Sequence, residues 1–123
     1  MSNITTIFVV EDDLSLQRLY SEILSLHGFH VVGAAKNGKE AVEIFKTFSE
    51  KPDIILMDHR MPVKNGIQAT KEILQYGDQS KIIFISADIS IREKALSIGA
   101  IHFIEKPFTY DQLVDHIKKV LLI

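Results

Sequence analysis

Short apolar segments alternate with segments of helical periodicity along the whole chain, and this alternation restricts the fold more than any other feature. Between the apolar segments the hydrophobic period becomes that of an amphipathic helix, as at Leu16, Leu19, Ile23 and Leu26. Repeated strand–helix units build a parallel sheet that helices cover on both faces. Five strands are predicted: Thr6–Val10, His30–Lys36, Asp53–Met57, Lys81–Ser86 and Ile101–Glu105.

Capping residues and glycines mark where the predicted helices begin and end. Asn, Ser or Thr followed three residues later by Glu or Gln can satisfy free backbone amides reciprocally, in a capping box. Four such pairs precede helical segments: Asn37 with Glu40, Asn65 with Gln68, Ser90 with Glu93, and Thr109 with Gln112. Asp13 is expected to cap the first helix. Glycines that can end a helix stand at Gly28, Gly77 and Gly99.

The composition of the strands predicts their order in the sheet. The segments IFVV, IILM and IIFI are apolar throughout, as strands buried on both faces must be. The segments HVVGAAK and IHFIE are more mixed, which suits edge strands. The order 2-1-3-4-5 satisfies both conditions. We therefore predict a doubly wound, flavodoxin-like α/β fold with five flanking helices and a crevice at the carboxyl ends of the first and third strands.

Composition and charge exclude several classes of function. The 123 residues suit a single domain over residues 1–123, and the net charge of −2 provides no basic surface for nucleic acid or an anionic membrane. The chain has no cysteine, which excludes disulfides, cysteine-ligated zinc and thiol catalysis. No apolar run reaches the length of a membrane span, and no signal peptide is evident. We expect a cytoplasmic protein.

Polar residues gather where the predicted sheet places its crevice. They are the acids Glu11, Asp12 and Asp13 after the first strand, Asp58 after the third, Ser86 at the end of the fourth, and Lys106 after the fifth. Clustered carboxylates raise one another's pKa values unless a cation joins them, and ligands that are all oxygen favour Mg²⁺. A lysine and a serine opposite the acids suit the oxygens of a phosphoryl group. Taken singly, each also fits a plainer role, Lys106 as a solvated loop residue and Ser86 as a strand end.

Four stretches of the sequence carry a family resemblance. IFVVEDD, IILMDHRMPVKNG, IIFISAD and IHFIEKPFTYDQL follow one another in this order over essentially the whole chain. Together they resemble the response-regulator receiver domain, the phosphoacceptor module of two-component signalling. The resemblance implies that Glu11, Asp12 and Asp58 hold Mg²⁺ with the backbone carbonyl of Arg60. It also implies that Asp58 accepts a phosphoryl group from a sensor histidine kinase, a phosphotransfer protein or a small phosphodonor.

The same resemblance assigns the remaining site residues. Lys106 contacts the phosphoryl group, and its peptide bond to Pro107 is expected to be cis. Ser86 and Phe103 form the switch, in which the hydroxyl moves toward the phosphoryl group and the ring turns inward. The readout is then the surface of the fourth helix, fifth strand and fifth helix, which binds a downstream protein target. The domain catalyses only its own phosphorylation and dephosphorylation, and is expected to be a monomer or a weak phosphorylation-dependent dimer.

Some residues are particular to this chain. Arg60 and Asp88 each follow a site residue by two positions and carry opposite charges. We predict that they pair across the mouth of the site and slow hydrolysis of the acyl phosphate; the alternative is two solvated surface charges. Phe103 can also be an ordinary strand aromatic that does not switch. His59 follows Asp58 on a loop expected to be exposed and lacks a partner at helical spacing. His27 and His30 straddle Gly28 at a turn and could chelate a metal ion, but we expect both to be surface residues.

Other functions fit the sequence less well. A haloacid-dehalogenase-type phosphatase needs a second acid two residues after its nucleophile, where this chain has Arg60. A Rossmann module needs glycines after its first strand, where this chain has EDDLSL. Two alternatives keep the fold: a phosphorylation-independent interaction module, and the receiver half of a longer transcriptional regulator. The initiating Met1 and the ending KKVLLI favour a stand-alone receiver without an output domain.

Overall fold

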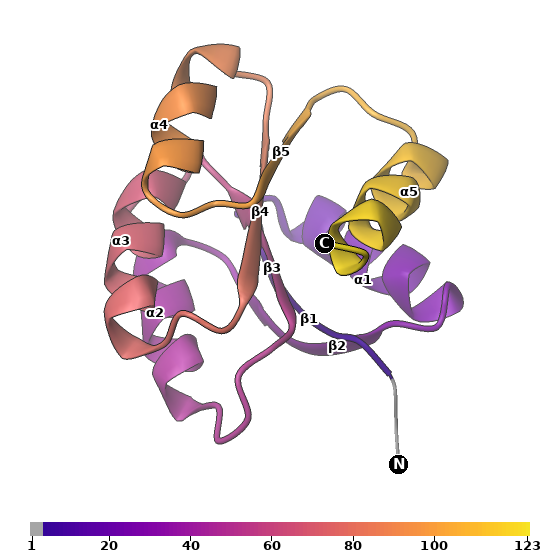
Figure 1. The fold of residues 1–123 in the computed structure, drawn as a ribbon, viewed down its shortest axis with the longest axis horizontal. Coiled ribbons are helices and arrows are strands. Elements are labelled where there is room, and N and C mark those ends of the chain that lie inside the picture. Colours follow the sequence, from indigo (N-terminus) through magenta and orange to yellow (C-terminus); the bar gives the residue numbers. More distant parts are fainter. Residues whose placement is uncertain (1–3) are drawn as a thin grey trace.

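A computed structural model describes residues 4–123 and shows one parallel five-stranded sheet between two layers of helices (Figure 1). Met1, which entered the expectation of a stand-alone chain, lies outside the described residues. The order β2-β1-β3-β4-β5 confirms the predicted topology. The predicted bounds of the first and fourth strands are reproduced, the second and fifth strands differ by one residue at one end, and the third is shifted by one residue at both ends. The strands are β1 Thr6–Val10, β2 His30–Ala35, β3 Ile54–Asp58, β4 Lys81–Ser86 and β5 His102–Glu105.

The helices divide between the two faces of the sheet. In Figure 1, α1 and α5 cover one face, and α2, α3 and α4 cover the other. A short 3-10 helix, η1, leads directly into α4. Within the described part of the chain, no helix is long and apolar enough to cross a membrane. The helices are α1 Leu14–Leu26, α2 Gly38–Thr47, α3 Gly66–Tyr76, η1 Ile89–Ile91, α4 Arg92–Ser97 and α5 Tyr110–Leu121.

The central strands contribute side chains to both faces, and this is why they are apolar throughout. Phe8 and Val10 of β1 belong to the core beneath α2 and α3, whereas Ile7 and Val9 belong to the core beneath α1 and α5. All four are fully buried. Burying a side chain of this size stabilises the fold by roughly 1.5–3 kcal/mol. The two cores therefore fix the register of β1 from both sides.

Most of the predicted helix boundaries are confirmed by side-chain caps. Asn65 and Thr109 form complete capping boxes at the starts of α3 and α5. Asp13 caps α1 by accepting from two backbone amides of its first turn. Asn37 caps α2, but the Glu40 carboxylate accepts from the backbone N–H of the residue before the cap instead of closing the box. The sequence pattern therefore located these four helix starts correctly.

The predicted capping box of Ser90 and Glu93 is wrong. Helix α4 begins at Arg92, and no side chain in the described part of the chain caps it. Ser90 instead lies inside η1, where Asp88 accepts its backbone N–H at 3.1 Å. The Ser90 hydroxyl also donates to the Asp88 carboxylate. Asp88, two residues before Ser90, therefore caps η1, and the Ser90 hydroxyl is bound to Asp88 instead of capping α4.

Two of the predicted terminator glycines adopt a left-handed backbone. Gly28 follows α1 with φ 87°, and Gly99 follows α4 with φ 121°. Only glycine takes this conformation without a penalty, so both positions end a helix as predicted. Gly77 ends α3 in an extended conformation with φ 166°, which any residue can adopt. The chain direction at this third end is therefore set by packing rather than by glycine.

Candidate functional site

Three carboxylates meet where β1 and β3 end. The two strands are neighbours, and Val10 pairs with Met57, so the residues that follow, Glu11 and Asp58, leave the sheet side by side. Carboxylate oxygens of Glu11, Asp12 and Asp58 lie within 4.8 Å of one another. Glu11 and Asp58 are buried, whereas Asp12 is exposed. The cluster therefore opens to solvent on the side of Asp12.

Repulsion between the buried carboxylates of the cluster favours the binding of a cation. Burial, followed by the nearby Asp58 charge, raises the pKa of Glu11 to about 7. Burial also raises the pKa of Asp58, although the Lys106 ammonium opposes that shift. A divalent cation among these oxygens would remove the repulsion, and hard oxygen donors open to water match the coordination of Mg²⁺. The residues present therefore fit a magnesium ion.

Lys106 reaches into the cluster from the end of β5. Its Nζ lies 3.4 Å from Glu11 Oε1 and 3.4 Å from Asp58 Oδ1. Its backbone N–H donates to the carbonyl of Ser86 at 3.0 Å, which fixes the loop after β5 to the end of β4. The peptide bond from Lys106 to Pro107 is cis, as predicted. The structure thus brings the predicted ammonium into contact with both buried acids.

Ser86 and Asp58 end neighbouring strands. Asp58 pairs with Ile85 across β3 and β4, so Ser86 is the next residue along the edge of the site. Ser86 is buried, and its Oγ accepts the backbone N–H of Asp88 at 3.0 Å. The Asp58 carboxylate accepts the backbone N–H of His59 at 3.0 Å. Both side chains are thereby held by backbone groups of the loops that follow their strands.

The start of α3 also fixes Asp58, in a way that the sequence did not predict. A Cβ on Gly66 would lie 2.5 Å from the carbonyl oxygen of Asp58, which is closer than real contacts allow. The Gly66 N–H donates to the carbonyl of His59 at 2.9 Å. Glycine is therefore needed at this position for α3 to pack against the end of β3.

The side chains of Arg60 and Asp88 lie close enough to interact. Arg60 Nη2 is 3.4 Å from Asp88 Oδ2. The Arg60 side chain is 79% exposed and that of Asp88 is 23% exposed. Hydrogen bonds from Ser90, more than the Arg60 charge, lower the pKa of Asp88. An ion pair this exposed contributes little to stability, so any role lies in covering the site.

Phe103 lies in the middle of β5 with its ring buried. Its exposed fraction is 8%, and it packs with the core residues beneath α3 and α4. The structure therefore shows the inward placement of the ring. Rotation of the ring stays a prediction.

The histidines set aside as metal ligands differ in their surroundings. His30 is exposed on β2, and His27 is exposed with Nδ1 2.9 Å from the carbonyl of Ile23. His59 is not the exposed residue that we expected. It is half-buried beside the Phe84 ring, with centroids 6.4 Å apart, and burial lowers its pKa. This contact with Phe84 of β4 depends on the tertiary fold and could not be predicted from the sequence.

Two polar contacts could not be predicted from the sequence. Gln17 Nε2 donates to the carbonyl of Glu11 at 3.1 Å and to that of Ala35 at 2.9 Å, joining α1 to the ends of β1 and β2. His102 Nε2 lies 2.8 Å from His116 Nδ1, between β5 and α5. From the sequence alone, Gln17 would be assigned to the polar face of its helix. The two histidines are separated by a loop and half a helix, so no spacing rule connects them.

Comparison with known proteins agrees with the fold and the acidic cluster. A family model described as the response regulator receiver domain matches residues 7–118. The chain is 41% identical over 117 residues to the chemotaxis protein CheY of Bacillus subtilis, covering 94% of this chain and 96% of that protein. It is 39% identical over 116 residues to CheY of Thermotoga maritima, covering 93% and 95%.

A solved structure shows the same architecture. The complex of CheX, CheY, BeF₃ and Mg²⁺ from Borrelia burgdorferi contains a chain that matches with a TM-score of 0.90 at 26% identity. The match covers 95% of this chain and 89% of that chain. The strand order, the acids at the strand ends and relatives of nearly equal length all lead to one assignment. The chain belongs to the response regulator receiver domain family, with the CheY-like fold of two-component and chemotaxis signalling.

Proposed function

We propose that the domain carries a signal by accepting a phosphoryl group on the Asp58 carboxylate. The position of Lys106 supports this most strongly, because its Nζ lies 3.4 Å from both Asp58 Oδ1 and Glu11 Oε1. One ammonium shared by two buried carboxylates leaves a negative site that suits a divalent cation. The Lys106 ammonium also donates to the oxygens of a phosphoryl group that arrives at Asp58.

The transfer follows from the groups around Asp58. A carboxylate oxygen attacks phosphorus in line and forms the new P–O bond. The bond to the donor breaks, and its electron pair leaves with the donor, such as the ring nitrogen of a phosphohistidine. The His59 N–H holds the Asp58 carboxylate, and Lys106 offsets charge on the phosphoryl oxygens. Water later hydrolyses the acyl phosphate, so the domain acts only on itself.

The acidic cluster is the proposed magnesium site. Glu11, Asp12 and Asp58 supply the carboxylates, and the backbone carbonyl of Arg60 is the further ligand that we assign. When bound, Mg²⁺ supplies positive charge that stabilises the phosphoryl oxygens during transfer. The exposed Asp12 leaves one side of the cluster open, where an incoming phosphodonor can approach.

The switch that we propose consists of Ser86 and Phe103. Ser86 Oγ accepts the N–H of Asp88, and its own hydroxyl is the donor that we assign to a phosphoryl oxygen. Movement of Ser86 toward that oxygen shifts the loop after β4. The buried Phe103 ring is the inward state of the switch. The populations of two states of the α4–β5–α5 surface then depend on the phosphoryl group.

Partners are proposed from the family and its relatives. The upstream partner is a sensor histidine kinase or a phosphotransfer protein, and the downstream partner is a protein that binds the α4–β5–α5 surface. The CheY of Borrelia burgdorferi forms a complex with CheX in the presence of BeF₃ and Mg²⁺. A comparable protein target is the partner class that we propose here.

The direct test is phosphorylation by a small phosphodonor, followed by intact mass measurement. We expect a gain of one phosphoryl group that requires Mg²⁺ and is absent in Asp58→Asn. The matched control is Asp53→Asn, because Asp53 lies at the other end of the β3 segment, where it accepts from the backbone of Thr6. This control should gain the phosphoryl group like the unmodified protein.

Two results would count against the proposal. A gain that persists in Asp58→Asn would place the phosphoryl group on another side chain. A folded protein that binds Mg²⁺ but gains nothing from small donors or from histidine kinases would favour the phosphorylation-independent interaction module.

A further inference from the structure

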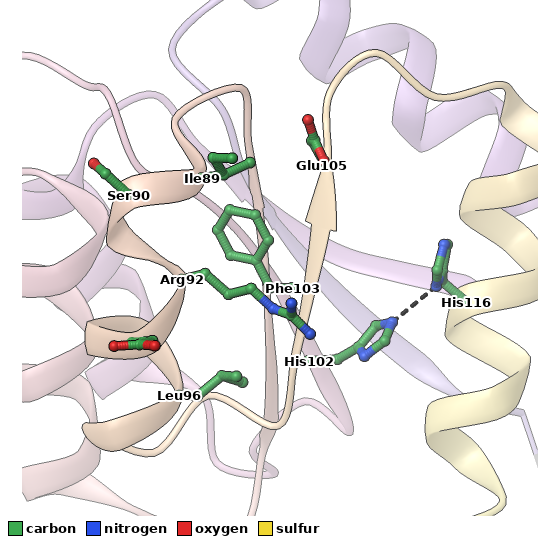
Figure 2. Close-up of a pocket in the computed structure, with 9 residues that line it drawn as sticks. Ile89, Ser90, Arg92, Leu96, His102, Phe103, Glu105 and His116 are labelled. Carbon is green, nitrogen blue, oxygen red and sulfur yellow. Dashed lines mark hydrogen bonds between the residues drawn. The ribbon is translucent and has the colours of Figure 1, made fainter.

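Two histidines meet between β5 and α5, away from the acidic cluster. Figure 2 shows the rings of His102 and His116 facing each other across the gap between strand and helix, joined by a hydrogen bond. Nε2 of His102 lies 2.8 Å from Nδ1 of His116, and the ring centroids are 4.9 Å apart. Both residues are half-buried at the edge of a pocket that Phe103 also lines. Nothing in the proposed phosphoryl chemistry uses them.

We propose that His102 Nε2 and His116 Nδ1 form a binding site for a divalent transition-metal ion of the Zn²⁺, Ni²⁺ or Cu²⁺ class. Imidazole nitrogen is a preferred ligand of these metals. The site is distinct from the oxygen cluster at Asp58, which suits a hard cation such as Mg²⁺. Water would complete the coordination, or a side chain of a protein docked on this surface.

The distance between the two nitrogens already fits such a site. Metal–nitrogen bonds of about 2.0–2.1 Å place two ligands roughly 2.9 Å apart at a right angle and about 3.4 Å apart at a tetrahedral angle. The observed 2.8 Å therefore needs little or no backbone movement. The rings must rotate so that both lone pairs point at one metal. The ring that donated the bridging hydrogen takes its other tautomer, so no net proton release is required from two neutral rings.

The surroundings keep His102 in the neutral form that binds metal. Burial, followed by His116, Arg92 and Lys119, lowers the pKa of His102. The positive groups come from α4 and α5, and they also disfavour a cation. The carboxylates of Glu93 of α4 and Glu105 of β5 line the same pocket. Metal ligation by histidine requires the neutral ring, so binding should weaken as the pH falls.

A bound metal would join β5 to α5. Phe103, the neighbour of His102 in the sequence, lies on β5 itself and packs in the core on the face that α5 does not cover. A ligand that binds only the folded arrangement stabilises it by mass action. The metal would therefore fix the packing of α5 on β5, on the surface that we propose for the downstream partner. The binding itself does not depend on phosphorylation of Asp58.

The test is a calorimetric titration of the untagged Asp58→Asn variant with Zn²⁺ or Ni²⁺ in excess Mg²⁺. This background removes phosphorylation and occupies the remaining acids with magnesium. We expect one site, weakened roughly tenfold or more in His102→Gln and in His116→Gln, since loss of even an outer-shell partner costs about 10–100-fold. His27→Gln and His30→Gln are the matched controls and should leave the affinity unchanged.

A second readout needs no variant of the pair. Small amounts of Cu²⁺ added to the protein should broaden the ring proton NMR signals of His102 and His116 before those of the other three histidines. The proposal is overturned if no site is found, if the affinity in His102→Gln and His116→Gln equals that of the parent Asp58→Asn protein, or if Cu²⁺ broadens the His27 or His30 signals first.

Discussion

At the scale of single residues, the site has more buried negative charge than its one ammonium offsets. Glu11 and Asp58 are buried, and Lys106 lies 3.4 Å from an oxygen of each. The sequence predicted these three residues together because each directly follows a predicted strand. It did not predict that Glu11 would hold its proton up to about pH 7, because that shift depends on burial in the folded chain.

The raised pKa of Glu11 predicts how stability changes with pH in protein stripped of Mg²⁺. The folded pKa of about 7 exceeds the ordinary value of 4.5, so the folded state binds more protons between these values. The contribution of Glu11 is therefore fully present below about pH 4.5 and is lost as the pH rises through about 7. We expect this loss to be on the order of 3 kcal/mol in the free energy of unfolding.

Urea unfolding in a chelator, at both ends of that range, measures the effect. Glu11→Gln should flatten the dependence, whereas Glu22→Gln, at an exposed position on α1, should leave it unchanged. Saturating Mg²⁺ should also reduce the dependence of stability on pH. An identical pH dependence in Glu11→Gln and the unmodified protein would contradict this explanation.

The Arg60–Asp88 pair is predicted to slow loss of the phosphoryl group from Asp58. The two side chains lie 3.4 Å apart, each two residues after a site residue, where they can limit the approach of water. We expect Arg60→Ala and Asp88→Asn each to shorten the lifetime of the acyl phosphate, and the double variant to add little. Asparagine is preferred at position 88 because it can still cap η1 through its side-chain oxygen.

Phosphate release after removal of the phosphodonor is the measurement for this pair. Stability should change little, since the pair is exposed. Equal decay rates in all four proteins would show that Arg60 and Asp88 are two solvated charges.

At the scale of elements, local signals located most boundaries and failed where a contact came from the tertiary fold. The capping boxes of α3 and α5 could be predicted because all their partners lie within four residues. The start of α4 was misplaced because Asp88 caps η1 and binds the N–H and hydroxyl of Ser90, so Ser90 lies inside η1 and does not cap a helix. The packing of Gly66 against Asp58 could not be predicted from neighbours in the sequence, because it depends on how α3 meets the end of β3.

Gly66→Ala is predicted to disturb the site, whereas Gly77→Ala at the other end of α3 is not. A Cβ at Gly66 would meet the Asp58 carbonyl at 2.5 Å, while at Gly77 the nearest atom is 3.6 Å away, on the Phe45 ring. We expect Gly66→Ala to cost roughly 1–3 kcal/mol of stability and to slow phosphorylation. Chemical unfolding and intact mass measure the two effects. Equal behaviour of the two variants would contradict the positioning role of Gly66.

At the scale of the whole molecule, the strand order creates the site. The order β2-β1-β3-β4-β5 places the carboxyl ends of β1 and β3 side by side at the middle of the sheet, with those of β4 and β5 next to them. The apolar composition of the first, third and fourth strands predicted that they are central, and the doubly wound order 2-1-3-4-5 satisfies this. The His102–His116 contact could not be predicted, because it depends on the register with which α5 packs on β5.

The central claim is that this arrangement directs a phosphoryl group to Asp58 and to no other carboxylate. The most direct measurement is to phosphorylate the protein in Mg²⁺, reduce the acyl phosphate with borohydride and locate the resulting homoserine by tandem mass spectrometry. Homoserine at position 58 alone is the result that the structure predicts. Reduction at Glu11, Asp12 or another acid, with Asp58 unchanged, would contradict it.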